Sequence, residues 1–354
     1  MKHVKPALRL ATLACTMVCL AGNLGAAKGE QMAIQGDSLV LAKTIPGNLC
    51  FDNIVKGSVA MRSTFLAGKP GSIVYTEGAD FVVDYPKGAI ARTANSRIPN
   101  YSENPLYRVV DFSHGNYTNY SNHPYFVWVD YQTTHGERLA RTNDQSKYLT
   151  GMRKKLEAGL PYKVVSYGDS IAAGGEASEP ELRFPARFGK YLQEQFPKAK
   201  VEVVDASIPG YTSQQGLEWF EKYLGPVEKP DLVLLGFGMN DHNIPGFGVE
   251  VEKFKQNFIA LVKMIRERKG AEVIIFSTMP PNETWHYGSH RMGQYAEAAK
   301  QAAAQVQCAY VDVYSVWQMV LRRKDQPSLL GNNINHPNDF GHWIYEQAFE
   351  AMKF

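Results

Sequence analysis

Five apolar runs in the second half of the chain alternate with longer segments of helical periodicity, and this alternation constrains the fold more than any other feature. The runs lie at 163–170, 201–207, 231–238, 272–279 and 309–315. Nearly continuous apolar runs are typical of strands buried on both faces of a parallel sheet. We therefore expect an α/β fold, with a doubly wound five-stranded parallel sheet of flavodoxin-like order, over 156–354.

The segment 249–270 is the clearest of the predicted helices. Phe254, Phe258, Leu261 and Ile265 recur on one face, and Gly270 follows a basic end. An apolar stripe of this period predicts a helix packed against the sheet, and glycine just past a helix is typical of its end.

Residues 28–155 have a different character. The stretch 71–93 alternates apolar and polar residues, with turn signals such as Pro86-Lys87-Gly88 inside it, and the stretch 123–134 is rich in aromatic and β-branched residues. Short strands with this spacing predict a smaller β-sandwich domain ahead of the α/β domain.

The first 27 residues have the pattern of a secretory signal peptide. A basic start is followed by an apolar run and by small residues ending at Ala27, and the run is too short to span a membrane. We predict a secreted or periplasmic protein with no stable membrane insertion. Cys15 and Cys19 lie inside the apolar run rather than at its end, which argues against a lipoprotein.

Charge and cysteine content narrow the function classes. The net charge is +3, and the predicted signal peptide carries three basic residues and no acid, so the remainder is near neutral. A nucleic-acid binder would need a basic face, so we expect no nucleic-acid partner. The two cysteines beyond residue 30, Cys50 and Cys308, pair in an exported protein or remain as buried thiols, and the sequence leaves both open.

Polar residues follow the predicted strands where an α/β site forms. Ser170 follows the first strand, Gly210 the second and Asn240 the third, and His336 precedes the last predicted helix. A serine needs a base to attack a carbonyl, and the oxyanion that forms needs preorganised N–H donors. The four residues together predict acyl transfer, with no metal and no cofactor.

The motifs that carry these residues resemble the SGNH (GDSL-type) hydrolases. They are Gly168-Asp169-Ser170, then Gly210, then Gly238-Met239-Asn240-Asp241, then His336-Pro337-Asn338, in the order of that family. The resemblance covers about 163 to the end. It implies Ser170 as nucleophile, His336 as base, and an oxyanion hole of Ser170, Gly210 and Asn240. Together with the front domain, it is similar to two-domain carbohydrate esterases with a jelly-roll domain.

The sequence departs from the family pattern in the glycine block, where Asp205 and Ser207 replace the usual Asn and Gly, and before the histidine. An aspartate usually stands three residues before the histidine, and here Asn333 does. An amide lacks the negative charge that stabilises an imidazolium. The interpretations are a Ser–His dyad with His336 oriented by Asn333 or a backbone carbonyl, a replacement acid such as Asp339 or Asp241, or an inactive relative.

Other polar residues receive structural interpretations. We expect Asp169 to bond the loops, His342 to pack near the start of the last helix, and Trp285, in a loop on the catalytic edge, to form a wall for the substrate. His336, Asp339 and His342 do not share one helical face, which argues against a metal cluster.

The chemistry of the motifs predicts that the substrate is an ester but does not indicate which ester. Export and the two-domain resemblance favour O-acetyl groups on polysaccharides. The alternatives are a lipase or aryl esterase, an O-acetyltransferase on the same site, and a non-catalytic polysaccharide-binding relative. The oligomeric state stays open.

Overall fold

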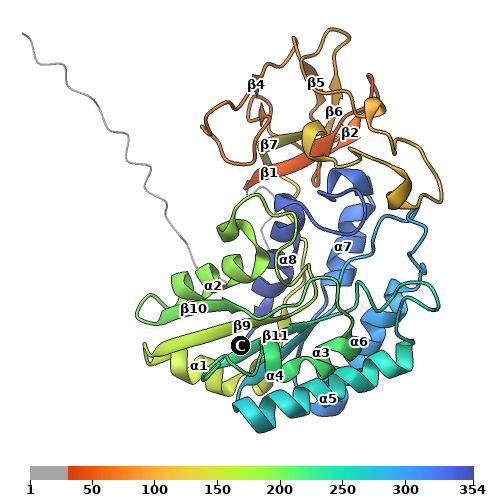
Figure 1. The fold of residues 1–354 in the computed structure, drawn as a ribbon. Helices are drawn as coiled ribbons and strands as arrows, with labels where there is room; N and C mark the ends of the chain where they lie inside the picture. Colours follow the sequence, from red (N-terminus) through yellow and green to blue (C-terminus); the bar gives the residue numbers. More distant parts are fainter. Residues whose placement is uncertain (1–30) are drawn as a thin grey trace, which may run out of the picture.

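A computed structural model describes residues 31–354 (Figure 1). The predicted signal peptide at 1–27, with Cys15 and Cys19, lies outside the described residues.

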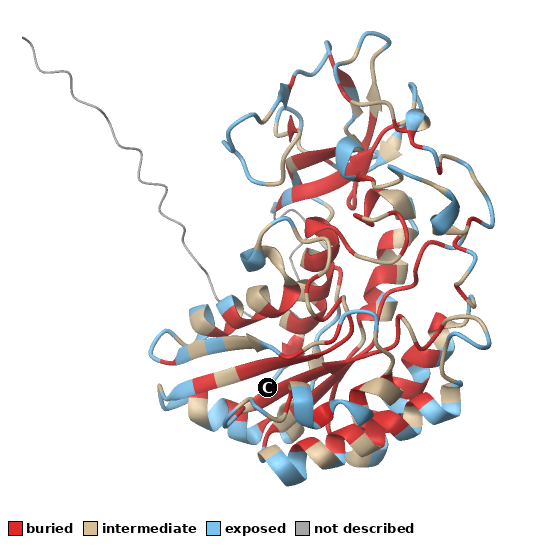
Figure 2. Cartoon of the chain, viewed as in Figure 1, coloured by how far each residue is buried: buried red, intermediate tan, exposed pale blue. Residues whose placement is uncertain are grey.

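The α/β domain is built on the predicted parallel sheet. Its strands are β9 (Pro161–Gly168), β10 (Lys200–Asp205), β11 (Leu232–Gly236), β12 (Glu272–Phe276) and β13 (Ala309–Val311), in the order β10-β9-β11-β12-β13. All neighbours are parallel. Every residue of β11 is buried, which explains its unbroken apolar run. Figure 2 shows the middle of the sheet as the buried centre of this domain, whereas the edge strand β10 is partly exposed.

The helices cover both faces, as a doubly wound fold requires. α2 (Phe184–Gln195), α7 (Val313–Leu321) and α8 (Asp339–Glu350) pack on one face, and α3 (Ser213–Glu218), α4 (Phe220–Tyr223), α5 (Val251–Lys269) and α6 (Met292–Val306) on the other (Figure 1). The helix predicted at 249–270 is α5, and Gly270 ends it in the left-handed conformation, with φ of 67°.

The fifth strand is shorter than predicted. It ends at Val311 because the side chain of Asp312 accepts a hydrogen bond from the Ser315 backbone N–H and begins α7. The expectation of a strand to residue 315 is therefore wrong.

The front part of the chain forms two antiparallel sheets. One contains β1 (Met32–Val40), β7 (Phe126–Thr133), β3 (Ala60–Arg62) and β4 (Val74–Tyr75), and the other β2 (Gly47–Asn48), β6 (Ala89–Arg92) and β5 (Phe81–Asp84). Side chains of both sheets, such as Val127 and Ile90, belong to one hydrophobic core. The connection between β6 and β7 contains η1 (Tyr101–Glu103), η2 (His114–Asn116) and η3 (His123–Tyr125).

The residues between the two parts pack with the α/β domain. β8 (Asn143–Asp144) pairs with β14 (Met352–Lys353), and η4 (Ser146–Tyr148) leads into α1 (Thr150–Glu157). Glu272 at the start of β12 accepts the backbone N–H groups of Gly151 and Met152. The short helices η5 (Pro180–Leu182) and η6 (Gln326–Ser328) lie in loops of the α/β domain.

Cys50 and Cys308 are both buried and free. The two residues therefore do not form the disulfide that the sequence allowed. Burial raises the pKa of the Cys308 thiol to about 12.

Candidate active site

The turn after β9 places Ser170 at the carboxyl edge of the sheet. A Cβ on Gly168 would lie 2.0 Å from the Gly236 carbonyl oxygen, so only glycine fits where β9 runs against β11. Asp169 accepts hydrogen bonds from the backbone N–H groups of Ile171 (3.0 Å) and Met239 (3.1 Å). It therefore ties the loop of Ser170 to the loop after β11, as its structural interpretation predicted. Burial raises the pKa of its carboxyl to about 6.

The structure brings Ser170 and His336 together. Ser170 Oγ lies 2.7 Å from His336 Nε2, although the two residues come from opposite ends of the α/β domain. His336 precedes α8, which begins where the side chain of Asn338 accepts the backbone N–H of Gly341 at 2.9 Å. Burial lowers the pKa of His336, and the charge of Glu176 opposes that effect in part. A neutral imidazole at hydrogen-bond distance from a hydroxyl can act as a general base.

The contacts at the other ring nitrogen correct the sequence interpretation. His336 Nδ1 lies 3.0 Å from Asn332 Nδ2, and a carboxylate oxygen of Glu176 lies 4.0 Å away. The side-chain oxygen of Asn333 instead accepts hydrogen bonds from Tyr101 (3.4 Å) and Asn282 (3.3 Å). Asn333 is turned away because its backbone is left-handed, with φ of 59°.

The two candidate replacement acids also have other partners. Asp339 accepts the backbone N–H of Ser178 at 2.8 Å. Asp241 accepts both the backbone N–H and the hydroxyl of Ser213 at the start of α3. Among the described residues, no backbone carbonyl makes a hydrogen bond to His336 Nδ1. The expectations for Asn333, Asp339 and Asp241 at this nitrogen are therefore wrong.

The candidate oxyanion donors lie at the same sheet edge. Gly210 follows β10 with φ of 82°, a conformation that glycine adopts without strain. Asn240 follows β11, and its Nδ2 donates one hydrogen bond to the Tyr211 carbonyl at 3.0 Å. This bond fixes the amide and leaves its second N–H for another acceptor. Because Asp241 holds the start of α3, the loop of Gly210 is held as well.

Trp285 is a packing residue rather than an open wall. It is 7% exposed and forms a small cluster with Leu106, Phe112 and Ile334. Its indole N–H donates to His114 Nδ1 at 3.1 Å. The expectation of a substrate wall is wrong, because residues of the front domain close over the ring. The half-buried tyrosines around this cluster are Tyr117, Tyr120 and Tyr287.

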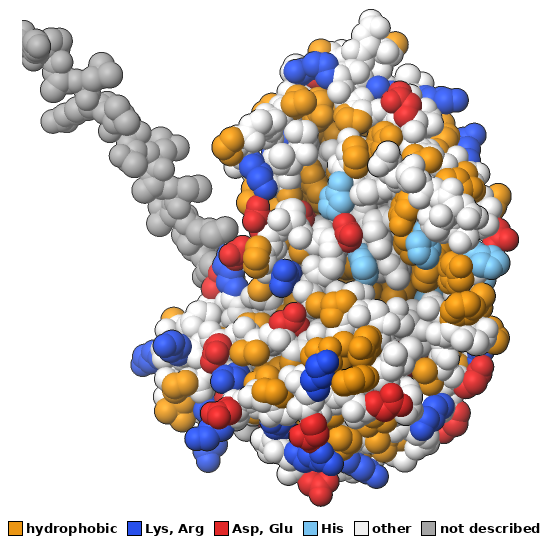
Figure 3. All heavy atoms as spheres, viewed as in Figure 1, with side chains coloured by type: hydrophobic (Ala, Val, Ile, Leu, Met, Phe, Trp, Pro, Cys, Tyr) orange, Lys and Arg blue, Asp and Glu red, His pale blue; other side chains and the backbone are white. Residues whose placement is uncertain are grey.

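The front domain reaches the loop that carries His336. The backbone N–H of Asn122 donates to the Gly331 carbonyl at 2.9 Å, and the Asn122 side chain donates to the Leu330 carbonyl at 2.9 Å. His123 Nε2 lies 2.5 Å from a carboxylate oxygen of Glu176. Figure 3 shows histidine side chains gathered on the face where the two parts of the chain meet.

His342 supports the site from behind. Its Nδ1 accepts from the Phe184 backbone N–H at 3.4 Å, and its Nε2 lies 3.1 Å from the Gly175 carbonyl. The ring stacks on Phe184, and burial lowers its pKa to about 3. These contacts agree with the packing role expected for it.

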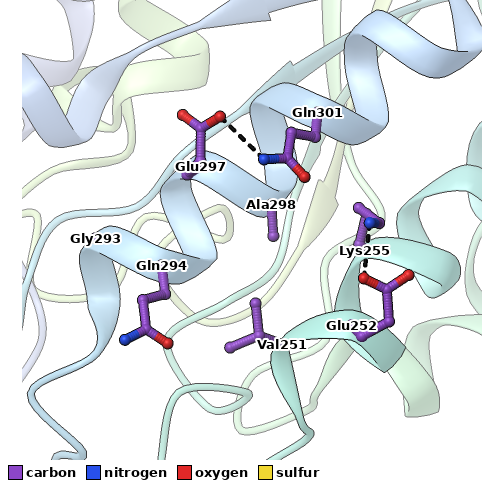
Figure 4. A pocket seen from close by; sticks show the side chains of 8 residues that line it. All are labelled: Val251, Glu252, Lys255, Gly293, Gln294, Glu297, Ala298 and Gln301. Atoms are coloured by element: carbon purple, nitrogen blue, oxygen red, sulfur yellow. Dashed lines mark hydrogen bonds and ion pairs between the residues drawn. The ribbon is translucent and has the colours of Figure 1, made fainter.

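Three further observations concern metal ions, the membrane and a hollow away from the site. Within residues 31–354 no three His, Cys, Asp or Glu side chains are arranged to hold a metal ion, and none of the helices there is both long and apolar enough to cross a membrane. A hollow of about 300 Å³ between α5 and α6, lined by residues such as Lys255, Gln294 and Glu297, contains none of the candidate site residues (Figure 4).

Comparison with known proteins decides the family. A family model described as GDSL-like Lipase/Acylhydrolase matches residues 166–344, from the middle of β9 into α8. The chain belongs to the GDSL-like lipase/acylhydrolase family. The expected family and fold class are confirmed, and the hydrolase match contains Ser170, Gly210, Asn240 and His336.

Solved structures of two esterases are among those similar to this GDSL-like hydrolase. One is a two-domain esterase active on acetylated mannans, with 22% identity, a TM-score of 0.48, and 60% of this chain and 54% of that chain covered. The other is Axe2, an acetylxylan esterase from Geobacillus stearothermophilus, with 23% identity, a TM-score of 0.45, and 53% and 92% covered. The chain thus spans about half the length of the mannan esterase. A comparison with curated proteins finds no match.

Sequence reasoning missed Glu176, Asn332 and His123. Glu176 stands only six residues after Ser170, and Asn332 stands beside Asn333, which the family pattern singles out. His123 belongs to the front domain and carried no signal of its own.

Proposed function

We propose that the protein hydrolyses O-acetyl esters of polysaccharides, with Ser170 as nucleophile and His336 as general base. The observation that carries the assignment of the two residues is the 2.7 Å contact between Ser170 Oγ and His336 Nε2. Ser170 and His336 are both partly accessible, so a substrate carbonyl can approach the serine hydroxyl from solvent.

The same geometry gives the two halves of the reaction. Ser170 Oγ attacks the ester carbonyl and its proton passes to His336 Nε2. The bond from the acyl carbon to the sugar oxygen then breaks as His336 protonates that oxygen, which leaves as a hydroxyl group. Water repeats the sequence on the acetyl-enzyme, releasing acetate and restoring the serine. The backbone N–H groups of Ser170 and Gly210 and the Asn240 amide stabilise the oxyanion at each step.

The rim of the site supports a sugar as the alcohol part of the ester. The front domain brings His114, Tyr117 and Tyr120 to the loops beside His336, and Tyr287 comes from the α/β domain. Such side chains combine a flat apolar ring with a polar edge, which suits the apolar faces and hydroxyl groups of a sugar. Phe247, at 63% exposure, and Val110, at 76%, are large exposed apolar side chains of these loops and are the features that would suit a lipid.

The proposal extends to location and domains. We propose that residues 1–27 direct export and that residues 28–155 and 156–354 are an accessory β-domain and the hydrolase domain. The contacts of Asn122 and His123 with the loops of the site support a shared role for the two domains.

Acetate release decides the proposed function. The purified protein should release acetate from 4-nitrophenyl acetate and from a panel of acetylated polysaccharides, beginning with acetylated mannan and acetylated xylan. Ser170→Ala should abolish release, whereas Ser178→Ala, an exposed serine of the same loop, should leave it unchanged. Faster turnover of long acyl chains would indicate a lipase, acetyl transfer to an added sugar would indicate a transferase, and no turnover of any ester would indicate a binding protein.

A further inference from the structure

Glu176 is the carboxylate nearest to the imidazole ring of His336. One of its oxygens lies 4.0 Å from His336 Nδ1, and the other lies 2.5 Å from His123 Nε2. Glu176 is thus placed between the histidine of the site and a histidine of the front domain. The family position for an acid, three residues before His336, holds Asn333, which faces elsewhere.

The backbone around Glu176 is built for this side chain. Glu176 has φ of 65°, a left-handed conformation that is strained for a residue other than glycine. Gly331, in the loop that carries His336, makes room for it, because a Cβ there would lie 2.6 Å from the Cβ of Glu176. Strain of this kind persists where surrounding contacts hold it and is found at functional sites.

Asn332 gives the reason why His336 needs a further partner. Its side-chain oxygen accepts the backbone N–H groups of Ile334, Asn335 and His336, which fixes the amide so that Nδ2 faces the ring. An NH₂ group 3.0 Å from Nδ1 favours the tautomer with the proton on Nε2. In that tautomer His336 donates to Ser170 Oγ and cannot take its proton.

We propose that Glu176 positions the productive tautomer of His336 and supplies the negative charge opposite the imidazolium, and that His123 of the front domain holds Glu176 in place. This inference rests on the proposed function of Ser170 and His336. Glu176 acts through His336 and is a positioning residue.

In the proposed attack by Ser170, the Glu176 carboxylate neither gains nor loses a proton. Ser170 Oγ forms a bond to the acyl carbon, and its proton moves to His336 Nε2. The proton on Nδ1 stays on the ring and is donated to Glu176 as a hydrogen bond. A contact of hydrogen-bond length requires rotation of the Glu176 side chain to bring its oxygen about 1 Å closer to the ring. It also requires the Asn332 NH₂ group, itself a donor, to move away from the protonated Nδ1.

The electrostatics around Glu176 favour its ionised form. The hydrogen bond and charge of His123 lower the pKa of the Glu176 carboxyl, with a further contribution from His336. Glu176 in turn raises the pKa of His123, and the more distant Asp339 at the start of α8 adds to this. His123 from the front domain and His336 from the loop before α8 thus act on Glu176, and Asp339 from α8 acts on His123.

The test compares Glu176→Gln with Glu179→Gln. Glu179 is a matched control because it lies in the same loop and pairs with Lys69 at 2.8 Å instead of with the site. We expect Glu176→Gln to lower kcat at least tenfold with little change in KM, and to move the acid limb of kcat/KM to lower pH, because loss of the negative charge lowers the pKa of His336. His123→Gln should give smaller changes in the same direction.

An NMR titration makes the result independent of turnover. In histidine-labelled protein carrying Ser170→Ala, the pKa of His336 should fall when Glu176→Gln is added and should not move with Glu179→Gln. Activity loss with an unchanged His336 pKa would show a merely structural role and overturn the inference, as would unchanged activity and pKa together. A wild-type protein that hydrolyses no ester would overturn the proposed function, whereas the titration would still report on Glu176.

Discussion

Lys324 Nζ lies 2.7 Å from Asp37 Oδ1, and neither side chain exposes any surface to solvent. Lys324 follows α7 in the α/β domain and Asp37 lies in β1 of the front domain. The other oxygen of Asp37 accepts the Cys50 backbone N–H at 2.6 Å and the Tyr131 hydroxyl at 2.8 Å, and Lys324 also donates to the Ser38 carbonyl. The ion pair is therefore a buried joint between the two domains.

Removing one partner of this pair should destabilise the protein strongly. Lys324→Met leaves the Asp37 carboxylate buried without its cation, which costs about 3–5 kcal/mol of unfolding free energy. Denaturant unfolding followed by circular dichroism measures the loss. Arg153→Met, which breaks the exposed Arg153–Glu157 pair, should cost about 0.5 kcal/mol or less and serves as the control. A loss of similar size in both variants would contradict this account of the joint.

Asn240 should contribute to the transition state and little to binding. Asn240→Ala removes one N–H donor to the oxyanion, so we expect kcat to fall by about 10²–10³ with KM nearly unchanged. Steady-state kinetics with 4-nitrophenyl acetate measures both constants. The exposed Asn116 provides a control, because its replacement by alanine should change neither. A rise in KM without a fall in kcat would remove Asn240 from the oxyanion hole.

The pH dependence of hydrolysis should follow the protonation of His336. A general base works only when neutral, so kcat/KM should be low at acid pH and should rise to a plateau as pH rises through the pKa of His336. Burial lowers that pKa below its ordinary value of 6.5, so activity should persist to more acidic pH than an exposed histidine would allow. A pH-stat assay of acetate release gives the profile. A midpoint above 6.5 would show that the base is another group or that His336 is not desolvated.

The two cysteines should be unreactive until the chain unfolds. Burial raises the pKa of both thiols, so neither forms the thiolate that attacks a disulfide reagent at neutral pH. Titration of the folded protein with such a reagent should detect no thiol, and titration in denaturant should detect those of Cys50 and Cys308. The melting temperature should be the same with and without reductant. A fall in melting temperature on reduction would indicate a bridge.

Most of the sheet could be predicted because β9, β11, β12 and β13 are largely buried on both faces, which leaves apolar runs in the sequence, whereas the edge strand β10 is partly exposed. Each predicted strand overlaps the observed one over most of its length. The predicted end is furthest from the observed end in β13, where the capping hydrogen bond of Asp312 begins a helix among residues that favour a strand. Ser170 and His336 could be placed at one edge because the topology of a parallel sheet fixes where its loops lie.

The residues that contact Trp285 and His336 could not be predicted from the sequence. Trp285 is buried by Leu106 and Phe112 of the front domain, and nothing in its own loop shows that those residues close over it. The choice between Asn332 and Asn333 depends on a left-handed backbone at Asn333, which turns consecutive side chains in different directions. Glu176 meets His336 only when the loop after β9 and the loop before α8 fold together.

The hydrophobic core runs without a break from the front sheets into the α/β domain, since Val127, Ile90, Leu329 and Phe340 belong to one cluster. Its consequence is thermodynamic cooperativity, because neither part can lose its packing without exposing apolar surface of the other. Heating should then produce one calorimetric transition for the whole molecule rather than two, and the front domain would not melt away to leave a working hydrolase behind.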